Sequence, residues 1–133
     1  MNISFNKRFL FFLFICFLIY LQGIFKLPVM DRDEARFATA SKTMLIDKDF
    51  IDIKMVEEKR YKKPVGIYWT QSLMNSIFGS YPYDKISIYR LPSILGVFIS
   101  FFLIFVIVRN IENESIAFLT VFFLIFSFLT ISE

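Results

Sequence analysis

Two adjacent carboxylates, Asp33 and Glu34, follow the first long apolar run of the chain. Beside a low-dielectric membrane, a carboxylate has to be solvated, paired or bound to a cation. Such groups could accept a proton from an attacking group, orient that group, or hold a divalent cation. The same pair also suits the first turn of a helix, where negative charge is favoured by the helix dipole. Spacing alone leaves the catalytic and the structural interpretation open.

A second group of charged side chains lies further along the chain and is strongly basic. It consists of Lys59, Arg60, Lys62 and Lys63. A phosphate or pyrophosphate group attracts such a cluster, and Arg can engage it through two hydrogen bonds. Anionic lipid headgroups attract it as well, at roughly 1 kcal/mol for each cation. The segment therefore predicts contact with phosphate, carried either by a substrate or by the membrane.

Aromatic residues follow this basic segment. Tyr68 and Trp69 could stack on a sugar or a prenyl chain, and they equally suit anchors at the boundary between membrane and water. The sequence has no His and a single cysteine, Cys16. These counts exclude a disulfide framework and a His-based metal site or triad. Ionic chemistry therefore falls to Asp, Glu, Lys, Arg and Tyr.

Three uncharged apolar runs must position these groups, at residues 9–25, 91–108 and 116–131. Hydrophobic residues make up 56% of the 133 positions, and Phe alone occurs 19 times. Helices of this length reach about 24–27 Å, enough to cross a hydrocarbon core with flanking anchors. The first run has no cleavage signal after it, which favours a retained anchor.

We therefore predict an all-α membrane protein with three transmembrane helices. Their expected ranges are 9–27, 91–108 and 116–132, and residues 28–90 form one long loop. Basic residues flank the N-terminal run and residues 109–115, which places both in the cytoplasm and the long loop outside it. The expected location is thus the inner (plasma) membrane, crossed several times, with an extracytoplasmic loop.

Within the loop, the periodicity predicts a helix that starts after Asp31 or Asp33 and runs to Leu45. Its apolar face suits a helix lying on the membrane, and an ordinary surface helix is the alternative. Residues 50–56 suggest a short strand. A second loop helix is expected from Pro64 to about Phe78, ended by Gly79.

With these motifs in place, the sequence resembles the N-terminal part of the family 39 membrane glycosyltransferases of the GT-C fold. That group includes aminoarabinose lipid A transferases and protein O-mannosyltransferases. The resemblance lies in three segments: Asp33-Glu-Ala-Arg-Phe-Ala38 after the first span, Tyr61-Lys-Lys-Pro-Val-Gly-Ile-Tyr-Trp69, and Arg90-Leu-Pro-Ser93 before the second span. It covers about residues 7–133.

The resemblance implies sugar transfer from a polyprenyl-phosphate sugar to a lipid or protein acceptor at the outer face of the inner membrane. It makes Asp33 and Glu34 the expected catalytic residues, with Asp33 as the key carboxylate. It implies that phosphate is held by Lys63, with Lys62, Arg60 and Arg36 nearby, and that Tyr68 and Trp69 contact substrate. No cofactor follows from it, and a divalent cation stays open. Nucleic acid is not an expected partner.

The chain departs from this group in length. Such enzymes usually have eleven to thirteen spans, so we expect an incomplete chain that does not catalyse transfer alone. The alternative is a small non-catalytic membrane protein that binds anionic lipid or a partner. Sugar, acceptor and oligomeric state are not determined by the sequence.

Overall fold

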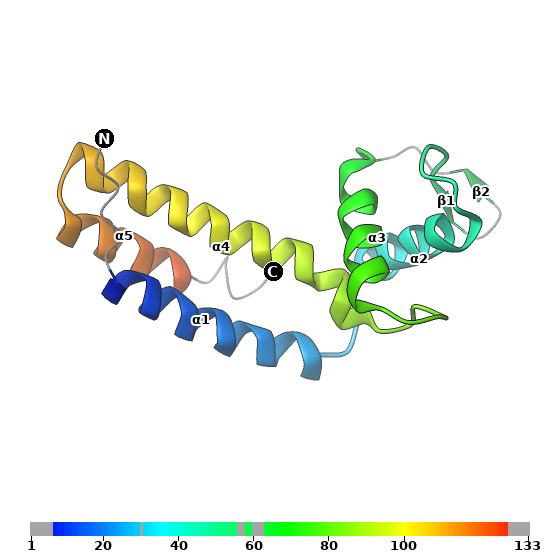
Figure 1. The fold of residues 1–133 in the computed structure, drawn as a ribbon, viewed down its shortest axis with the longest axis horizontal. Coiled ribbons are helices and arrows are strands. Elements are labelled where there is room, and N and C mark those ends of the chain that lie inside the picture. Colours follow the sequence, from blue (N-terminus) through cyan, green and yellow to red (C-terminus); the bar gives the residue numbers. More distant parts are fainter. Residues whose placement is uncertain (1–6, 30, 56–57, 60–62, 128–133) are drawn as a thin grey trace. The chain divides into compact units, whose positions relative to one another are not determined.

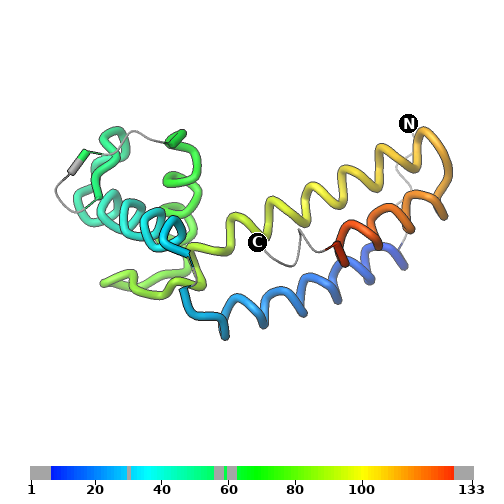
Figure 2. Tube along the Cα trace, turned by 180° about the vertical axis from the view of Figure 1, so that it is seen from behind, coloured from blue at the N-terminus to red at the C-terminus, as the bar shows by residue number. Residues whose placement is uncertain are grey.

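The computed structural model describes residues 7–29, 31–55, 58–59 and 63–127. The chain divides into two compact units (Figures 1 and 2). The apolar unit holds the chain up to Gly23 and again from Ile94, and the connecting unit is Ile24–Ser93. The division falls inside two long helices, α1 (Lys7–Lys26) and α4 (Ile86–Ile111), each of which contributes to both units.

The apolar unit packs α1 and α4 with α5 (Glu114–Ile125). Figure 2 shows that α5 runs back beside α4 after a short connection. Asn113 starts α5 because its side-chain oxygen accepts a hydrogen bond from the Ile116 amide at 2.9 Å. The buried core is almost entirely apolar: Phe9, Leu13, Cys16, Phe101, Phe105, Ala117, Val121 and Ile125. The Tyr20 hydroxyl, which would be costly to bury alone, donates to the Ile125 carbonyl at 2.8 Å.

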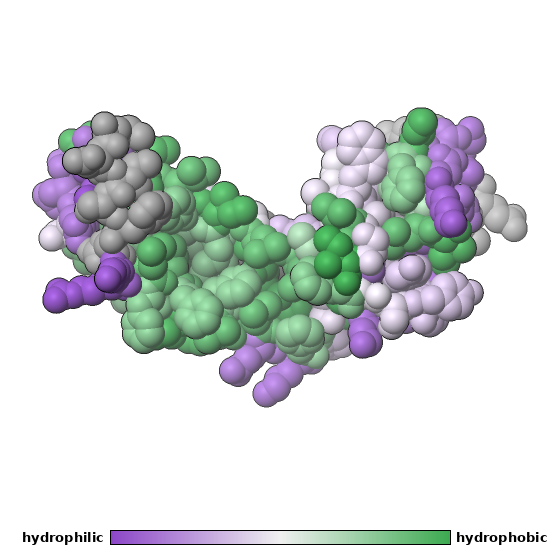
Figure 3. All heavy atoms as spheres, viewed as in Figure 1, coloured by the Kyte–Doolittle hydropathy of each residue, from purple (hydrophilic) through white to green (hydrophobic). Residues whose placement is uncertain are grey.

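Within the described residues, α1 and α4 are the helices long and apolar enough to cross a membrane. Apolar side chains cover most of this unit on the face shown in Figure 3. Helix α5 is apolar but shorter, with 12 residues. The expected third span, 116–132, runs on into residues outside the described part, so it stays a prediction. Helix α4 begins at Ile86, before the predicted start at residue 91, and Pro92 lies inside it.

The connecting unit contains α2 (Arg32–Asp47), a two-stranded hairpin and α3 (Gly66–Phe78). The side chain of Asp31 caps α2 by accepting from the Asp33 amide at 3.3 Å, so the predicted start is confirmed. Lys48, in the left-handed conformation, ends the helix. The predicted end of α3 is also confirmed, since Gly79 follows its last residue, although the helix begins at Gly66 rather than Pro64.

The predicted strand at residues 50–56 is much shorter in the structure, and it makes the fold not purely α. Strand β1 (Lys54–Met55) pairs antiparallel with β2 (Glu58–Lys59). Residues before β1 form a turn instead, because the Asp49 carboxylate accepts from the amides of Ile51 and Asp52 at 3.2 and 3.1 Å. A local side-chain bond thus replaces the extended backbone that the alternating pattern suggested.

Helix α2 does not offer its apolar face to a membrane, as we had expected. That face is buried against α3 in a core of Ala40, Met44, Ile53 and Tyr68. Instead α3 is the unusual helix, because it buries polar side chains and exposes apolar ones. Its buried residues include Gln71, Ser72 and Asn75. The exposed stripe consists of Trp69, Leu73, Ile77 and Phe78.

Candidate functional site

The first turn of α2 sends its two adjacent carboxylates into different surroundings. Asp33 is 48% exposed and pairs with Arg36, one turn further on, at 3.0 Å. Glu34 is only 25% exposed and pairs with Arg90 of α4, itself 16% exposed. Successive helical residues point about 100° apart, which explains how neighbours reach different partners. Asp33 is therefore the more solvent-exposed of the two carboxylates, and Glu34 forms an ion pair in the interior of the connecting unit.

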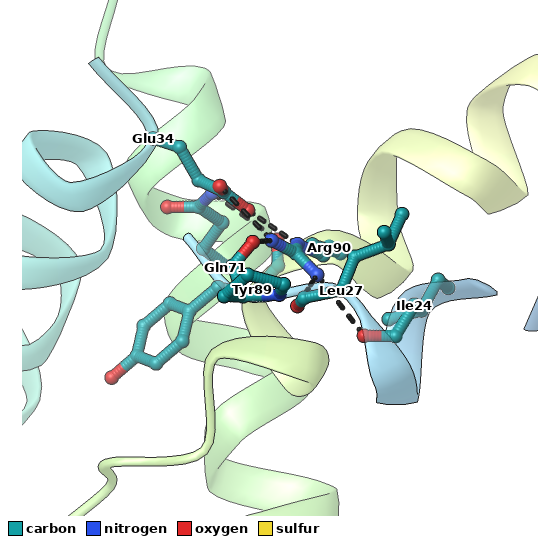
Figure 4. A network of polar contacts seen from close by, with 7 residues as sticks. Ile24, Leu27, Glu34, Gln71, Tyr89 and Arg90 are labelled. Carbon is teal, nitrogen blue, oxygen red and sulfur yellow. Dashed lines mark hydrogen bonds and ion pairs between the residues drawn. The ribbon is translucent and has the colours of Figure 1, made fainter. Parts of the chain in front are cut away.

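Arg90 joins three segments of the connecting unit (Figure 4). Its Nε and Nη2 donate to the two oxygens of Glu34, the second at 3.1 Å. Its Nη1 donates to the carbonyls of Ile24 and Leu27 at 3.0 and 2.7 Å, and Nη2 to that of Pro28 at 2.8 Å. The last carbonyls of a helix lack partners within the helix and favour a nearby cation. Arg90 thus ties the end of α1 to the start of α2.

A buried polar network supports the backbone next to Arg90. Gln71 of α3 donates to the Tyr89 carbonyl at 3.2 Å and accepts from the Ser41 hydroxyl of α2 at 2.8 Å. The hydroxyl of Ser72 donates to the Ser41 carbonyl at 3.1 Å. Figure 4 shows Gln71 and Tyr89 beside the Glu34–Arg90 pair. Buried polar groups need such partners, so α2, α3 and α4 are held in one register.

The expected phosphate-binding residues are only partly described. Lys63 lies exposed just before α3, whereas Arg60 and Lys62 are outside the described residues. Arg36 is bound to Asp33. Within the part of the chain that the structure describes, Asp33 forms its ion pair with Arg36 and not with Lys63. Their convergence on one phosphate stays a prediction.

The two expected aromatic residues have opposite positions. Trp69 is 50% exposed, and its indole N–H donates to the Phe50 carbonyl at 2.7 Å. Tyr68 is 1% exposed and packs on Phe37, with ring centroids 5.5 Å apart. The prediction that Tyr68 stands exposed at an interface is therefore wrong, because its ring fills the core between α2 and α3. Substrate contact through an exposed aromatic is left to Trp69.

A partly buried ion pair near the hairpin has a structural role that the sequence did not indicate. Lys54 lies 3.1 Å from Asp49. Hydrogen bonds from the Asp52 amide, the Lys54 ammonium and the Ile51 amide lower the pKa of the Asp49 carboxyl. The hydrogen bond to Asp49 correspondingly raises the pKa of Lys54. Both shifts favour the charged forms and stabilise the turn before β1.

The described residues do not gather three or more Cys, Asp or Glu side chains that could hold a metal ion. They do contain one residue whose importance the sequence only hinted at. Arg90 opens the Arg90-Leu-Pro-Ser93 segment before the second expected span. Its position at the edge of an apolar run was the available signal, because a charge there needs a partner. The sequence does not reveal that the partner is Glu34.

A known family accounts for the second half of the chain. The family described as dolichyl-phosphate-mannose-protein mannosyltransferase matches residues 62–132, more than half of the sequence. The chain belongs to this family. The matched region of the mannosyltransferase family includes α3, α4 and α5. Asp33 and Glu34 lie before it.

Two curated relatives have the same name, undecaprenyl phosphate-alpha-4-amino-4-deoxy-L-arabinose arabinosyl transferase 2. The protein from Proteus mirabilis HI4320 is 27% identical over 101 residues, which is 75% of this chain and 18% of the relative. The protein from Pseudomonas fluorescens Pf-5 is 28% identical over 82 residues, which is 62% of this chain and 13% of the relative. This member of the mannosyltransferase family thus spans less than a fifth of their length. No solved structure matches it.

Proposed function

We propose that this sequence forms the N-terminal part of a membrane glycosyltransferase. The enzyme transfers a glycosyl group from a polyprenyl-phosphate sugar to a lipid acceptor of the lipid A type or to a protein. The observation that carries the proposal is the family match over residues 62–132. The names of the two relatives support an undecaprenyl-phosphate donor. Neither observation selects the acceptor.

The reaction is a substitution at the anomeric carbon of the sugar. The acceptor oxygen forms a bond to this carbon while the bond from the carbon to the phosphate oxygen breaks. The electron pair of the broken bond leaves on the polyprenyl phosphate, and attack from the opposite side inverts the anomeric configuration. A hydroxyl acceptor also loses a proton, which a carboxylate accepts, whereas a phosphate acceptor is already ionised and needs only orientation.

Asp33 is the carboxylate suited to this role, because Glu34 is held by Arg90. The ion pair of Asp33 with Arg36 is exposed, and exposed pairs contribute only about 0–1 kcal/mol. A substrate phosphate can therefore draw Arg36 towards itself and leave Asp33 beside the acceptor. In this proposal Arg36 binds substrate phosphate. The Asp33 carboxylate accepts the proton of a hydroxyl acceptor or orients a phosphate acceptor.

The leaving phosphate gains negative charge during the reaction. Lysine and arginine side chains directed at that charge lower the barrier most where water is excluded. Lys63 is proposed for this role, assisted by Lys62 and Arg60. Trp69, half-exposed on α3, is proposed to contact the sugar or the prenyl chain.

The proposed location is the inner membrane, with the N-terminus in the cytoplasm and the connecting unit outside. The apolar α1 and α4 support the membrane part of this proposal. The exposed stripe of α3 supports contact of the connecting unit with membrane lipid, because a Trp beside aliphatic side chains is typical of the membrane–water boundary.

The test uses the full-length gene product that contains this sequence, in membranes supplied with synthetic polyprenyl-phosphate sugars and lipid or protein acceptors. Asp33→Asn should lower transfer about 100-fold or more, the effect of losing an acid–base group. Asp47→Asn is the matched control, because it makes the same chemical change at the other end of α2. Transfer by Asp33→Asn at the wild-type rate would remove Asp33 from the mechanism. An inactive wild type that binds anionic vesicles would favour the non-catalytic alternative.

A further inference from the structure

We infer that Arg90 is a positioning residue that acts through Glu34 to set the direction of Asp33. This inference rests on the proposed function, since it needs Asp33 to be the reacting carboxylate. It assigns Glu34 a different role from the catalytic one expected from the sequence.

Every N–H group of the Arg90 guanidinium has a hydrogen-bond acceptor. An arginine side chain has five N–H donors, and the five hydrogen bonds of Arg90 go to the two oxygens of Glu34 and to three carbonyls. These carbonyls belong to Ile24, Leu27 and Pro28, at the end of α1 and just beyond it. A side chain with every donor engaged has no capacity left for a substrate phosphate. Its arrangement therefore suits fixing protein segments and not binding a ligand.

The fixed direction of Glu34 determines that of Asp33. Both lie in the first turn of α2, where helix geometry sets a rotation of about 100° between neighbours. Arg90 holds Glu34 inward by two hydrogen bonds, so α2 cannot rotate about its axis without breaking them. Asp33 is consequently kept on the open side of the turn, at 48% exposure.

The backbone next to Arg90 is itself held in place by a hydrogen bond from α3. The carbonyl of Tyr89, the residue before Arg90, accepts from the buried amide of Gln71 at 3.2 Å. Gln71 is in turn bound to Ser41, in the middle of α2. The start of α4 therefore fixes α2 at two places. Arg90 binds the first turn of α2, and Gln71 links the Tyr89 carbonyl to the middle of α2. A lysine at position 90 would keep the charge but lose the planar fork that makes these bonds.

The experiment measures kcat and donor KM for Arg90→Lys and Glu34→Gln in the full-length gene product. Misplacing the reacting carboxylate should lower kcat about 10- to 100-fold and leave donor KM within about threefold, because a displacement near 1 Å has that effect. Lys42→Met is the matched control, since it breaks another ion pair of the same unit, with Asp84. It should leave kcat unchanged.

A double substitution separates positioning from general destabilisation. In an Asp33→Asn background, Arg90→Lys should lower the remaining rate by less than about twofold, because residues that act as a unit are not additive. If Asp33→Asn is at background, Asp33→Glu serves instead. The inference is overturned if Arg90→Lys lowers the rate in the Asp33→Asn background by the same factor as in the wild type. It is also overturned if Arg90→Lys and Glu34→Gln both keep the wild-type kcat. Wild-type activity of Asp33→Asn would instead overturn the proposed function, whatever Arg90 does. If Arg90→Lys does not accumulate, Glu34→Gln decides alone.

Discussion

Glu34 and Arg90, 56 positions apart in the sequence, form a bidentate ion pair between the start of α2 and the start of α4. The same arginine covers the carbonyls at the end of α1. One side chain therefore connects both candidate membrane helices to the helix that carries Asp33. The end of α1, the start of α2 and the start of α4 are thus joined by the hydrogen bonds of one guanidinium.

Loss of this guanidinium should destabilise the protein strongly. Arg90→Ala leaves the largely buried Glu34 carboxylate without its partner, which should lower the free energy of unfolding by about 3 kcal/mol. Denaturant unfolding in detergent would measure the change. The double variant Arg90→Ala with Glu34→Ala should recover part of the loss, because no charge is then left unpaired. A change below about 0.5 kcal/mol for Arg90→Ala would show that solvent replaces the pair.

The adjacent aromatic residues Tyr68 and Trp69 provide a matched comparison. Tyr68→Ala removes a ring that is 1% exposed and should cost about 3–5 kcal/mol of unfolding free energy. Trp69→Ala should cost clearly less, since half of that side chain is exposed. The same unfolding measurement ranks the two. Equal losses would contradict the placement of Tyr68 in the core between α2 and α3.

A methyl group at Gly79 should not fit. A Cβ built there would lie 2.5 Å from the Asn75 carbonyl oxygen and 3.2 Å from its side-chain oxygen. The backbone carbonyl also accepts from the Gly79 amide at 2.9 Å, so it cannot move without losing that bond. We expect Gly79→Ala to lower stability by about 1–3 kcal/mol. Gly66→Ala is the control, because its Cβ would meet nothing within 4 Å. A neutral Gly79→Ala would show that the end of α3 relaxes.

The Asp49–Lys54 pair predicts a dependence on pH. The folded pKa of Asp49 lies below its ordinary value of 3.8, so its contribution is complete above that value and is lost as pH falls through the lowered pKa. The folded pKa of Lys54 lies above 10.5, so its contribution is lost only as pH rises beyond that value.

Asp49→Ala should therefore be less stable than wild type between these limits, and the difference should shrink in acid below pH 3.8. Unfolding measured over a pH series checks this, with Asp47→Ala as the control at the end of α2. A stability difference that stays constant down to strongly acidic pH would mean that the charge of Asp49 does not contribute.

Local signals in the sequence were enough to place several elements. The acidic segment predicts that α2 starts after Asp31 or Asp33, and Gly79 after an apolar helix predicts the end of α3. Both signals act through hydrogen bonds to backbone groups within a few residues, so no distant contact is needed to interpret them. The long uncharged runs likewise identify α1 and α4, because composition alone makes them apolar.

The faces of the connecting helices could not be predicted in this way. Helix α2 has the apolar periodicity of a membrane-surface helix, yet it buries that face against α3. Tyr68 and Trp69 are neighbours of similar type, and only the packing of the core between α2 and α3 against Tyr68 decides which of them is buried. Burial is a property of the partner surface, which no local pattern contains.

The sequence by itself determined that this protein has long apolar helices, an acidic first turn after α1 and a family relationship carried by residues 62–132. Only the tertiary structure decided that Glu34 and Asp33 have different partners and different exposure. The reason is that a carboxylate's role depends on which charges surround it, and the charge that engages Glu34 comes from a helix that begins far along the chain. Periodicity governs neighbours one turn apart, whereas Arg90 meets Glu34 through the folding of the whole connecting unit.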